Sequence, residues 1–212
     1  MKTLLFCFAA SFIANAAERR SSGGSPGEFD FYVLSLSWSP QHCATKGSND
    51  RLQCAEGREY GFILHGLWPQ YDRGYPSDCS TKPVAKSVID AMLPIMPSPG
   101  LIRHEWSKHG TCSGLSSTKY FELARDAYNK VRIPNPFKSP RDRITFAPAK
   151  IRQEFSRATP GLPENSISVL CAGRFVQEVR VCMTKDLEPR KCNDEVARDH
   201  CRLDEIIFRP VR

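Results

Sequence analysis

The chain has 212 residues, of which 41% are hydrophobic and 25% are charged. These proportions are close to globular averages, so they exclude an intrinsically disordered chain and favour a compact domain with its own core. The formal net charge is +7, which favours a polyanionic partner such as nucleic acid, anionic lipid or acidic polysaccharide, although such a charge can also serve solubility alone.

The N-terminus predicts a secretory signal peptide over residues 1–16. Lys2 gives it a positive start, and residues 4–13 form an apolar run too short to cross a bilayer. Ala14 and Ala16 flank Asn15 in the small-x-small pattern that signal peptidase accepts. No later stretch of the sequence is apolar enough for a transmembrane helix. We therefore expect a secreted protein with no membrane partner, periplasmic in a bacterium and otherwise extracellular or lumenal.

The rest of the chain divides by composition into two parts. Residues 17–28 include a stretch rich in Gly and Ser, which predicts a flexible leader. Residues 29–212 contain no internal repeat or low-complexity tract, so we expect them to form a single domain.

Hydrophobic patterns predict strands and helices that follow no regular βαβ repeat, so the expected class is α+β. Strands are predicted where short runs are rich in β-branched and aromatic residues, at residues 29–38, 60–67, 167–171, 175–183 and 206–208. Helices are predicted where apolar residues recur at helical spacing, at residues 83–96, 117–131 and 148–157, and Ser117 is the expected cap of the second. Loops are predicted at residues 43–54 and 135–143.

The cysteine count is informative once export is assumed. Of the nine cysteines, Cys7 lies in the predicted signal, and an even number remains in the mature chain. An even number in an exported protein indicates four disulfides, and the zinc alternative is weak because no Cys-x-x-Cys pair is present. Many pairings are compatible with the sequence, and the eight cysteines are Cys43, Cys54, Cys79, Cys112, Cys171, Cys182, Cys192 and Cys201.

Three of the five histidines lie in two short segments, HGLWP from His65 and HEWSKHGTC from His104. In a helix, Glu105 and His109 would share one face, and His104 and Lys108 would share a neighbouring face. The two histidines of the second segment are five residues apart, about 140° around a helix, which argues against the shared metal of a zinc-protease helix. The segment instead gathers two imidazoles, a cation and a carboxylate.

This set of side chains suits the cleavage of RNA. The ribose 2′-hydroxyl must lose a proton and the leaving 5′-oxygen must gain one, and imidazoles with an unperturbed pKa of about 6.5 can perform both transfers. A lysine can stabilise the negative charge that develops on the phosphate. Because the nucleophile belongs to the substrate, the reaction requires no metal and cannot act on DNA.

The two histidine segments resemble the two catalytic signatures of the ribonuclease T2 family. The likeness extends to the strand that ends at Trp38, to Tyr75-Pro76 with Cys79, and to the C-terminal group of four cysteines. The resemblance implies a disulfide-stapled fold with a central, mainly antiparallel sheet flanked by helices. It also implies a secreted endoribonuclease that acts on single-stranded RNA as a monomer, without cofactor, metal or obligate protein partner.

The resemblance also assigns roles to the five polar residues of the two segments. His109 would be the general base on the 2′-hydroxyl, and His65 would be the general acid for the 5′-oxygen. His104 would bind phosphate, while Glu105 and Lys108 would stabilise the pentacoordinate phosphorus. The products would be 2′,3′-cyclic phosphates, which such enzymes can hydrolyse to 3′-phosphates.

Base recognition would depend on aromatic stacking, because unstacked RNA bases bind well to flat rings. Trp68 and Tyr75 match the family's first base site. Gln70 is the third candidate for base contact, but the chain departs from the family there, since some members carry Asp, and the base preference stays open. Leu101 and Ile102 stand where many members carry Phe-Trp, which predicts a weaker second base site. The disulfide pairs implied by the resemblance are Cys43–Cys54, Cys79–Cys112, Cys171–Cys201 and Cys182–Cys192.

Two other functions remain open from the sequence. A metal-dependent hydrolase would use His65, His104 and His109 as ligands, and a secreted module that binds RNA or another polyanion would have no turnover. His42 and His200 adjoin cysteines and match no catalytic signature, so we expect them to be ordinary surface or loop residues.

Overall fold

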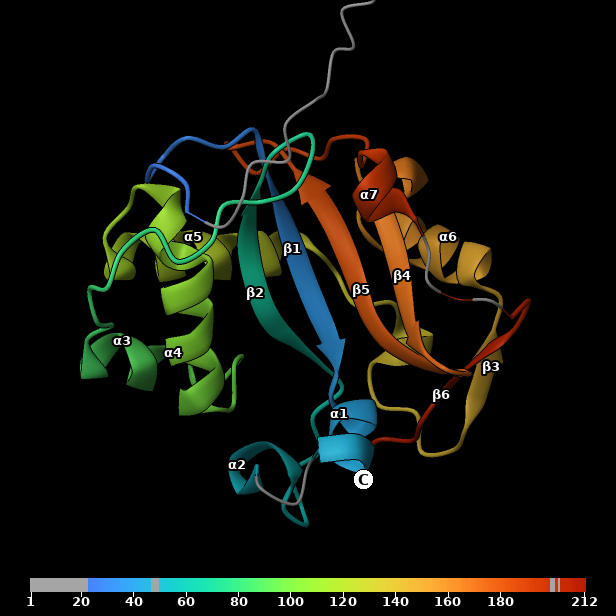
Figure 1. Ribbon diagram of the computed structural model, residues 1–212. Coiled ribbons are helices and arrows are strands. Elements are labelled where there is room, and N and C mark those ends of the chain that lie inside the picture. Colours follow the sequence, from blue (N-terminus) through green and yellow to red (C-terminus); the bar gives the residue numbers. More distant parts are fainter. Residues whose placement is uncertain (1–22, 47–49, 199–200, 202) are drawn as a thin grey trace, which may run out of the picture.

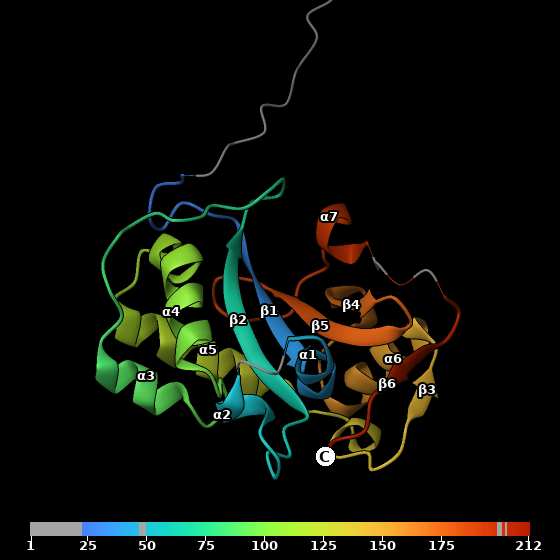
Figure 2. The same ribbon diagram turned by 60° about the horizontal axis from the view of Figure 1, so that its bottom comes forward.

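The computed structural model describes residues 23–46, 50–198, 201 and 203–212. The predicted signal peptide, residues 17–22 of the predicted leader, and His200 lie outside the described residues. A twisted sheet runs through the middle of the molecule, with helices along its sides and behind it (Figures 1 and 2). Within the described residues, no helix combines the length and apolar character needed to cross a membrane.

The described residues form one six-stranded sheet in the order β2-β1-β5-β6-β3, with β4 paired to β5. All strand pairs are antiparallel except β5 with β6, which is parallel. The predicted α+β class with a mainly antiparallel sheet is therefore confirmed. The strands are β1 Phe31–Trp38, β2 Phe62–Gln70, β3 Ile144–Phe146, β4 Ile167–Ala172, β5 Phe175–Met183 and β6 Ile206–Phe208.

The helices occupy distinct sides of this sheet. In both views α3, α4 and α5 lie beside and behind β2, and α6 lies behind β4 (Figures 1 and 2). The helices are α1 Ser39–Lys46, α2 Arg51–Cys54, α3 Lys86–Met92, α4 Pro99–Lys108, α5 Ser117–Lys130, α6 Pro148–Ala158 and α7 Asp194–Ala197, with 3₁₀ turns η2 Gly110–Ser113, η3 Asn135–Phe137 and η4 Glu164–Ser166.

Three local predictions are corrected. The helix predicted over residues 83–96 is shorter at both ends: α3 begins at Lys86 and ends at Met92, ahead of Pro94, which has no N–H with which to continue it. The hydroxyl of Ser116, rather than Ser117, caps α5 by accepting a hydrogen bond from the Lys119 amide. The loop predicted over residues 43–54 contains the end of α1 and all of α2.

Strand β1 separates two cores because its side chains alternate between the faces of the sheet. Leu34 and Leu36 are fully buried in the main core, which α5 and α6 cover from behind. Val33 faces the other way, into a smaller core that includes the Cys182–Cys192 disulfide. Ser35 and Ser37 continue that second face toward α1, so the front of the sheet becomes polar there.

Four disulfides link distant segments, and their pairing is the one implied by the family resemblance. Cys79–Cys112 ties the loop after β2 to the 3₁₀ turn after α4. The N-terminal segment lies nearby, since the Gly27 amide donates a hydrogen bond to the Cys112 carbonyl at 2.9 Å. The four pairs are Cys43–Cys54, Cys79–Cys112, Cys171–Cys201 and Cys182–Cys192.

Candidate active site

A β-bulge positions His65. Ser35 on β1 pairs with Gly66 on β2. The next residue, Leu36, pairs with Leu64, so His65 is the extra residue on β2. A bulge turns a side chain out of the normal alternation of a strand. The imidazole of His65 therefore stands over the polar front of the sheet.

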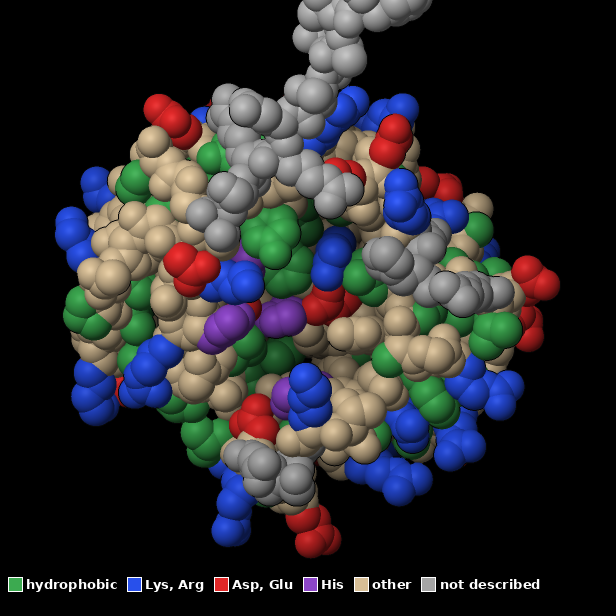
Figure 3. All heavy atoms as spheres, in the orientation of Figure 1, with side chains coloured by type: hydrophobic (Ala, Val, Ile, Leu, Met, Phe, Trp, Pro, Cys, Tyr) green, Lys and Arg blue, Asp and Glu red, His purple; other side chains and the backbone are tan. Residues whose placement is uncertain are grey.

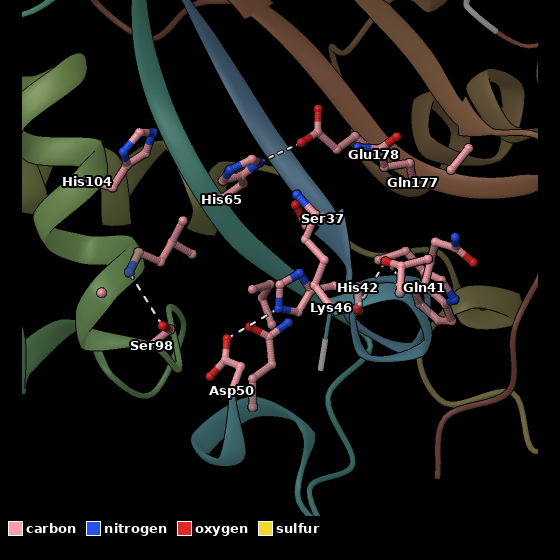
Figure 4. A pocket seen from close by; sticks show the side chains of 17 residues that line it. Ser37, Gln41, His42, Lys46, Asp50, His65, Ser98, His104, Gln177 and Glu178 are labelled. Carbon is pink, nitrogen blue, oxygen red and sulfur yellow. Dashed lines mark hydrogen bonds and ion pairs between the residues drawn. The ribbon is translucent and has the colours of Figure 1, made fainter. Parts of the chain in front are cut away.

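The two nitrogens of His65 meet different carboxylates. Nδ1 lies 2.5 Å from Oε1 of Glu178 on β5, and Nε2 lies 3.5 Å from Oε1 of Glu105 on α4. The guanidinium of Arg180 donates two hydrogen bonds to Oε2 of Glu178, at 3.0 and 2.9 Å. Figure 4 shows the bond between His65 and Glu178 at the edge of a pocket.

These contacts shift the pKa values of His65 and Glu178 in opposite directions. Burial lowers the pKa of His65, but the hydrogen bond and charge of Glu178 outweigh burial, and the net pKa is raised above its usual 6.5. Burial would raise the pKa of Glu178, which is 3% exposed, but His65 and Arg180 lower it to about 2. Because Glu178 stays ionised, it accepts the Nδ1 proton of His65.

Helix α4 brings the second histidine segment to the same place. Ser98 caps the helix by accepting a hydrogen bond from the Leu101 amide, and Pro99 occupies the first turn, where its missing N–H is tolerated. Glu105 is buried on the sheet side, whereas His104 is exposed and Lys108 is half-buried. The helix thus presents one carboxylate inward and two potential cations at the rim.

Glu105 is packed against β2. It is 1% exposed, and its Oε2 accepts a 2.6 Å hydrogen bond from the indole Nε1 of Trp68. A Cβ on Gly66 would overlap the Glu105 carboxylate and the Trp68 indole nitrogen, so only glycine permits this close approach. Burial raises the pKa of Glu105 to about 7, although His65 and Trp68 oppose the shift.

His109 follows the last residue of α4 and is 8% exposed. Its ring lies 5.2 Å from the Trp68 ring and 6.0 Å from the Tyr75 ring, measured between centroids. Its Nδ1 is buried and has no hydrogen-bond partner among the described residues. Burial, followed by the charge of Lys108, lowers the pKa of His109 to about 3, so its imidazole is neutral near pH 7.

The predicted base-site residues differ in their placement. Trp68 is half-buried and lies in the centre, with its ring centroid 5.3 Å from that of His65 and 4.9 Å from Cζ of Arg180. Tyr75 is 45% exposed beside His109. Gln70 is buried, and its amide donates to the Pro69 carbonyl at 2.9 Å.

A pocket of about 690 Å³ opens beside His65, His104 and Glu178 and extends toward α1 and α2 (Figure 4). Histidine side chains gather in the middle of this face, with acidic and basic side chains around them (Figure 3). His42, expected to be an ordinary surface or loop residue, lies on helix α1 and lines this pocket. Its Nε2 is 3.3 Å from Oδ2 of Asp50.

Comparison with known proteins identifies the family. The profile of the ribonuclease T2 family matches residues 29–192. The chain belongs to the ribonuclease T2 family. This T2-type endoribonuclease is 36% identical to a ribonuclease of Aeromonas hydrophila, over 99% of its own length and 97% of the relative's. It is 28% identical to ribonuclease DdI of Dictyostelium discoideum, over 76% of each chain.

Solved structures share the fold of the T2 ribonuclease. Ribonuclease MC1 from bitter gourd seeds superposes with a TM-score of 0.68, at 24% identity, over 85% of this chain and all of the other. Ribonuclease NT in complex with 5′-AMP gives a TM-score of 0.65, at 22% identity, over 86% of this chain and 99% of the other. The four disulfides and these relatives indicate a secreted or extracellular protein.

The T2 ribonuclease contains two site residues that sequence reasoning missed, Glu178 and Arg180. Both lie on β5, in the sequence FVQEVRVCM. The available signal was a pair of opposite charges two residues apart, and therefore on one face of a mostly apolar strand. Trp106, which is buried, belongs to the main core. In the part of the chain that the structure describes, no group of three or more His, Cys, Asp or Glu side chains is placed to hold a metal ion.

Proposed function

We propose that this T2 ribonuclease cleaves single-stranded RNA by transphosphorylation without a metal. The ribose 2′-oxygen attacks the adjacent phosphorus, the bond to the 5′-oxygen breaks, and a 2′,3′-cyclic phosphate results. One observation carries the proposal: two imidazoles flank Trp68 in environments that favour opposite protonation states, cationic for His65 and neutral for His109.

The two environments match the two proton transfers. His109 is neutral, so it can accept the proton of the 2′-hydroxyl as general base. His65 holds its proton more tightly, and because Nδ1 is bonded to Glu178, Nε2 is the nitrogen that can protonate the departing 5′-oxygen. Neighbouring titratable groups with pKa values pushed apart are the usual basis of acid and base assignment.

The remaining polar residues would act on the phosphate. Lys108 and His104 provide cationic or donor groups at the rim, where negative charge develops on the phosphoryl oxygens. Glu105, with a pKa of about 7, is largely protonated in mildly acidic solution and can then donate a hydrogen bond to a phosphoryl oxygen. Its carboxyl lies between His65 and Trp68, close to both.

The aromatic rings would bind the base on the 2′-hydroxyl side. The rings of Trp68 and Tyr75 both lie near that of His109, at centroid distances of 5.2 and 6.0 Å, and aromatic rings bind unstacked bases by stacking. A mutant of ribonuclease MC1 has been crystallised with 5′-UMP and ribonuclease NT with 5′-AMP, so this fold accommodates nucleotides in those proteins. Gln70 would contact the edge of the base after its amide leaves the Pro69 carbonyl.

The test is digestion of homopolymeric RNAs in EDTA, with the product ends identified, by the wild type and by the His65→Ala and His109→Ala variants. We expect cyclic phosphate ends from the wild type and a loss of about 10²- to 10⁴-fold in each variant, which is the usual contribution of a general acid or base. Loss of activity in EDTA with recovery in zinc would support a metal-dependent hydrolase, and RNA binding without turnover would support a binding module.

The compartment and the oligomeric state of the enzyme are also proposed. We propose that it acts outside the cytoplasm, in the periplasm if its source is a bacterium, as a monomer that needs no protein partner. Size-exclusion chromatography with light scattering on the active protein tests the oligomeric state directly.

A further inference from the structure

We propose that Glu178 and Arg180 are positioning residues for the general acid, which hold His65 through Nδ1 and so reserve Nε2 for the proton that goes to the leaving group. The inference rests on the proposed function, because it assigns a device to the same reaction. Neither residue belongs to the two histidine segments.

The sheet makes this contact possible across an intervening strand. His65 is on β2 and Glu178 is on β5, with β1 between them. Strands two places apart in a sheet are separated by about 10 Å, which is too far for most side chains to meet if the middle strand carries large ones. Here β1 presents Ser37 opposite Glu178 and Ser35 opposite Arg180. These small side chains leave room for Glu178 to reach over β1 to the bulged His65.

The two oxygens of Glu178 are divided between two partners. Oε2 accepts both hydrogen bonds from Arg180, and Oε1 is left for Nδ1 of His65. A buried carboxylate is stable only when it is paired and hydrogen-bonded, so Arg180 keeps Glu178 ionised and fixes its orientation. Arg180 also contacts the Trp68 ring, which in turn donates to Glu105. The arrangement connects β5 to His65 directly and to Glu105 through Trp68.

The consequence for His65 is a fixed ring and a fixed tautomer. A hydrogen bond from Nδ1–H fixes the orientation of an imidazole ring and leaves the other nitrogen, Nε2, to exchange a proton. The charged groups facing His65 are Glu178 and Arg180 from β5 and Glu105 from α4. Burial and Arg180 lower the pKa of His65, and Glu178 and Glu105 raise it. Neutralising Glu178 would therefore lower that pKa and move the alkaline limb of the rate profile to lower pH.

The test compares two substrates that differ only in the leaving group. A dinucleoside phosphate expels an alkoxide, which needs a proton, whereas a nucleoside 3′-(4-nitrophenyl phosphate) expels a phenolate, which does not. Glu178→Gln keeps the size of the side chain and an acceptor for Nδ1 but removes the charge. We expect it to lower kcat on the dinucleotide at pH 7 by about 10- to 10³-fold, with little change in KM, and to change kcat on the aryl ester by less than about 3-fold.

Three comparison variants sharpen the result. Glu178→Asp retains the charge and should recover part of the lost kcat. His65→Ala should show the same substrate dependence as Glu178→Gln, with a larger loss, whereas His109→Ala should lose both reactions. The matched control is Glu154→Gln, which removes a buried, ion-paired glutamate on α6 that lies away from the site and should leave both rates unchanged.

A direct readout of His65 completes the experiment. Nitrogen NMR of the imidazole should show the Nδ1–H tautomer in neutral His65 of the wild type, and a lowered pKa in Glu178→Gln. Because that variant leaves Arg180 without its carboxylate, Glu178→Gln/Arg180→Gln is measured beside it, with thermal unfolding as the check on folding. The double variant should also lower the pKa of His65, but by less than Glu178→Gln alone, because Arg180 itself lowers that pKa.

The outcomes separate the two claims. If His65→Ala loses dinucleotide cleavage while both Glu178 variants keep the wild-type substrate ratio and His65 titration, the positioning role is wrong and the proposed function stands. If His65→Ala cleaves the dinucleotide as well as the wild type does, the proposed function itself is wrong.

Discussion

Glu105 is placed where its charge opposes folding, so its neutral isostere should make the protein more stable. The carboxyl is 1% exposed, and burial raises its pKa from 4.5 to about 7. Below pH 4.5 both the folded and the unfolded chain hold the proton. Between pH 4.5 and 7 the folded chain binds more protons than the unfolded chain, so the free energy of unfolding falls as the pH rises through this window.

The size of the effect follows from the shift. Raising the pKa from 4.5 to about 7 is a change of 7 − 4.5, or about 2.5 units, and each unit corresponds to about 1.36 kcal/mol. The raised pKa of Glu105 therefore lowers the free energy of unfolding by up to about 3 kcal/mol at pH 8, where the carboxyl is ionised in the folded chain, and by about 1 kcal/mol at pH 5, where it ionises only in the unfolded chain. Glu105→Gln should recover these amounts while keeping an acceptor for the Trp68 indole.

The assay is urea unfolding of the wild type, Glu105→Gln and Glu154→Gln at pH 5 and pH 8, with the disulfides intact. Glu105→Gln should gain more stability at pH 8 than at pH 5 and should lose RNA cleavage. Glu154 has a lowered pKa from its pairing with Arg157 and Lys150, so its variant should gain nothing at either pH. A Glu105→Gln variant that is no more stable than the wild type at pH 8 would refute the reasoning.

Three further predictions follow from the packing of the site. Gly66→Ala should displace Glu105, lower the stability by about 1–3 kcal/mol in urea and reduce cleavage at least about 10-fold; wild-type values of both would show that the contact is not needed. Trp68→Phe removes the indole donor, so carbon NMR should find the pKa of Glu105 raised further, and an unchanged titration would contradict the hydrogen bond. Replacing both cysteines of Cys79–Cys112 by serine should reduce the rate of RNA cleavage more than the same change in Cys43–Cys54, because only the first pair holds the turn that follows His109. Equal losses of rate in the two variants would contradict this role.

Elements whose patterns are local could be predicted from the sequence. The strand at Ile206–Phe208 and the start of the helix at Pro148 agree with their predicted positions because hydrophobic periodicity and a first-turn proline are properties of a few neighbouring residues. Strand β3 was not predicted. It has three residues and pairs with β6, about sixty residues further along the chain, so nothing near it in the sequence indicates a strand.

The candidate site likewise contains some residues whose placement follows from local sequence and others whose placement depends on long-range strand pairing. The face shared by Glu105 and His109 follows from the helical repeat and was predicted, and the structure places both side chains in the buried part of the site. The contact between His65 and Glu178 depends on the strand order β2-β1-β5 and on a bulge, and both are set by long-range pairing. Sequence spacing alone contains no information about either, which is why Glu178 was missed.

The central claim is that His65 and His109 enter the reaction in opposite protonation states. The most direct measurement is an NMR titration of both imidazoles in the folded, ligand-free enzyme. We expect His109 to remain neutral until the pH falls far below 6.5, toward about 3, and His65 to hold its proton above pH 6.5. If the order is reversed, with His109 holding its proton to higher pH than His65, the assignment of base and acid is contradicted.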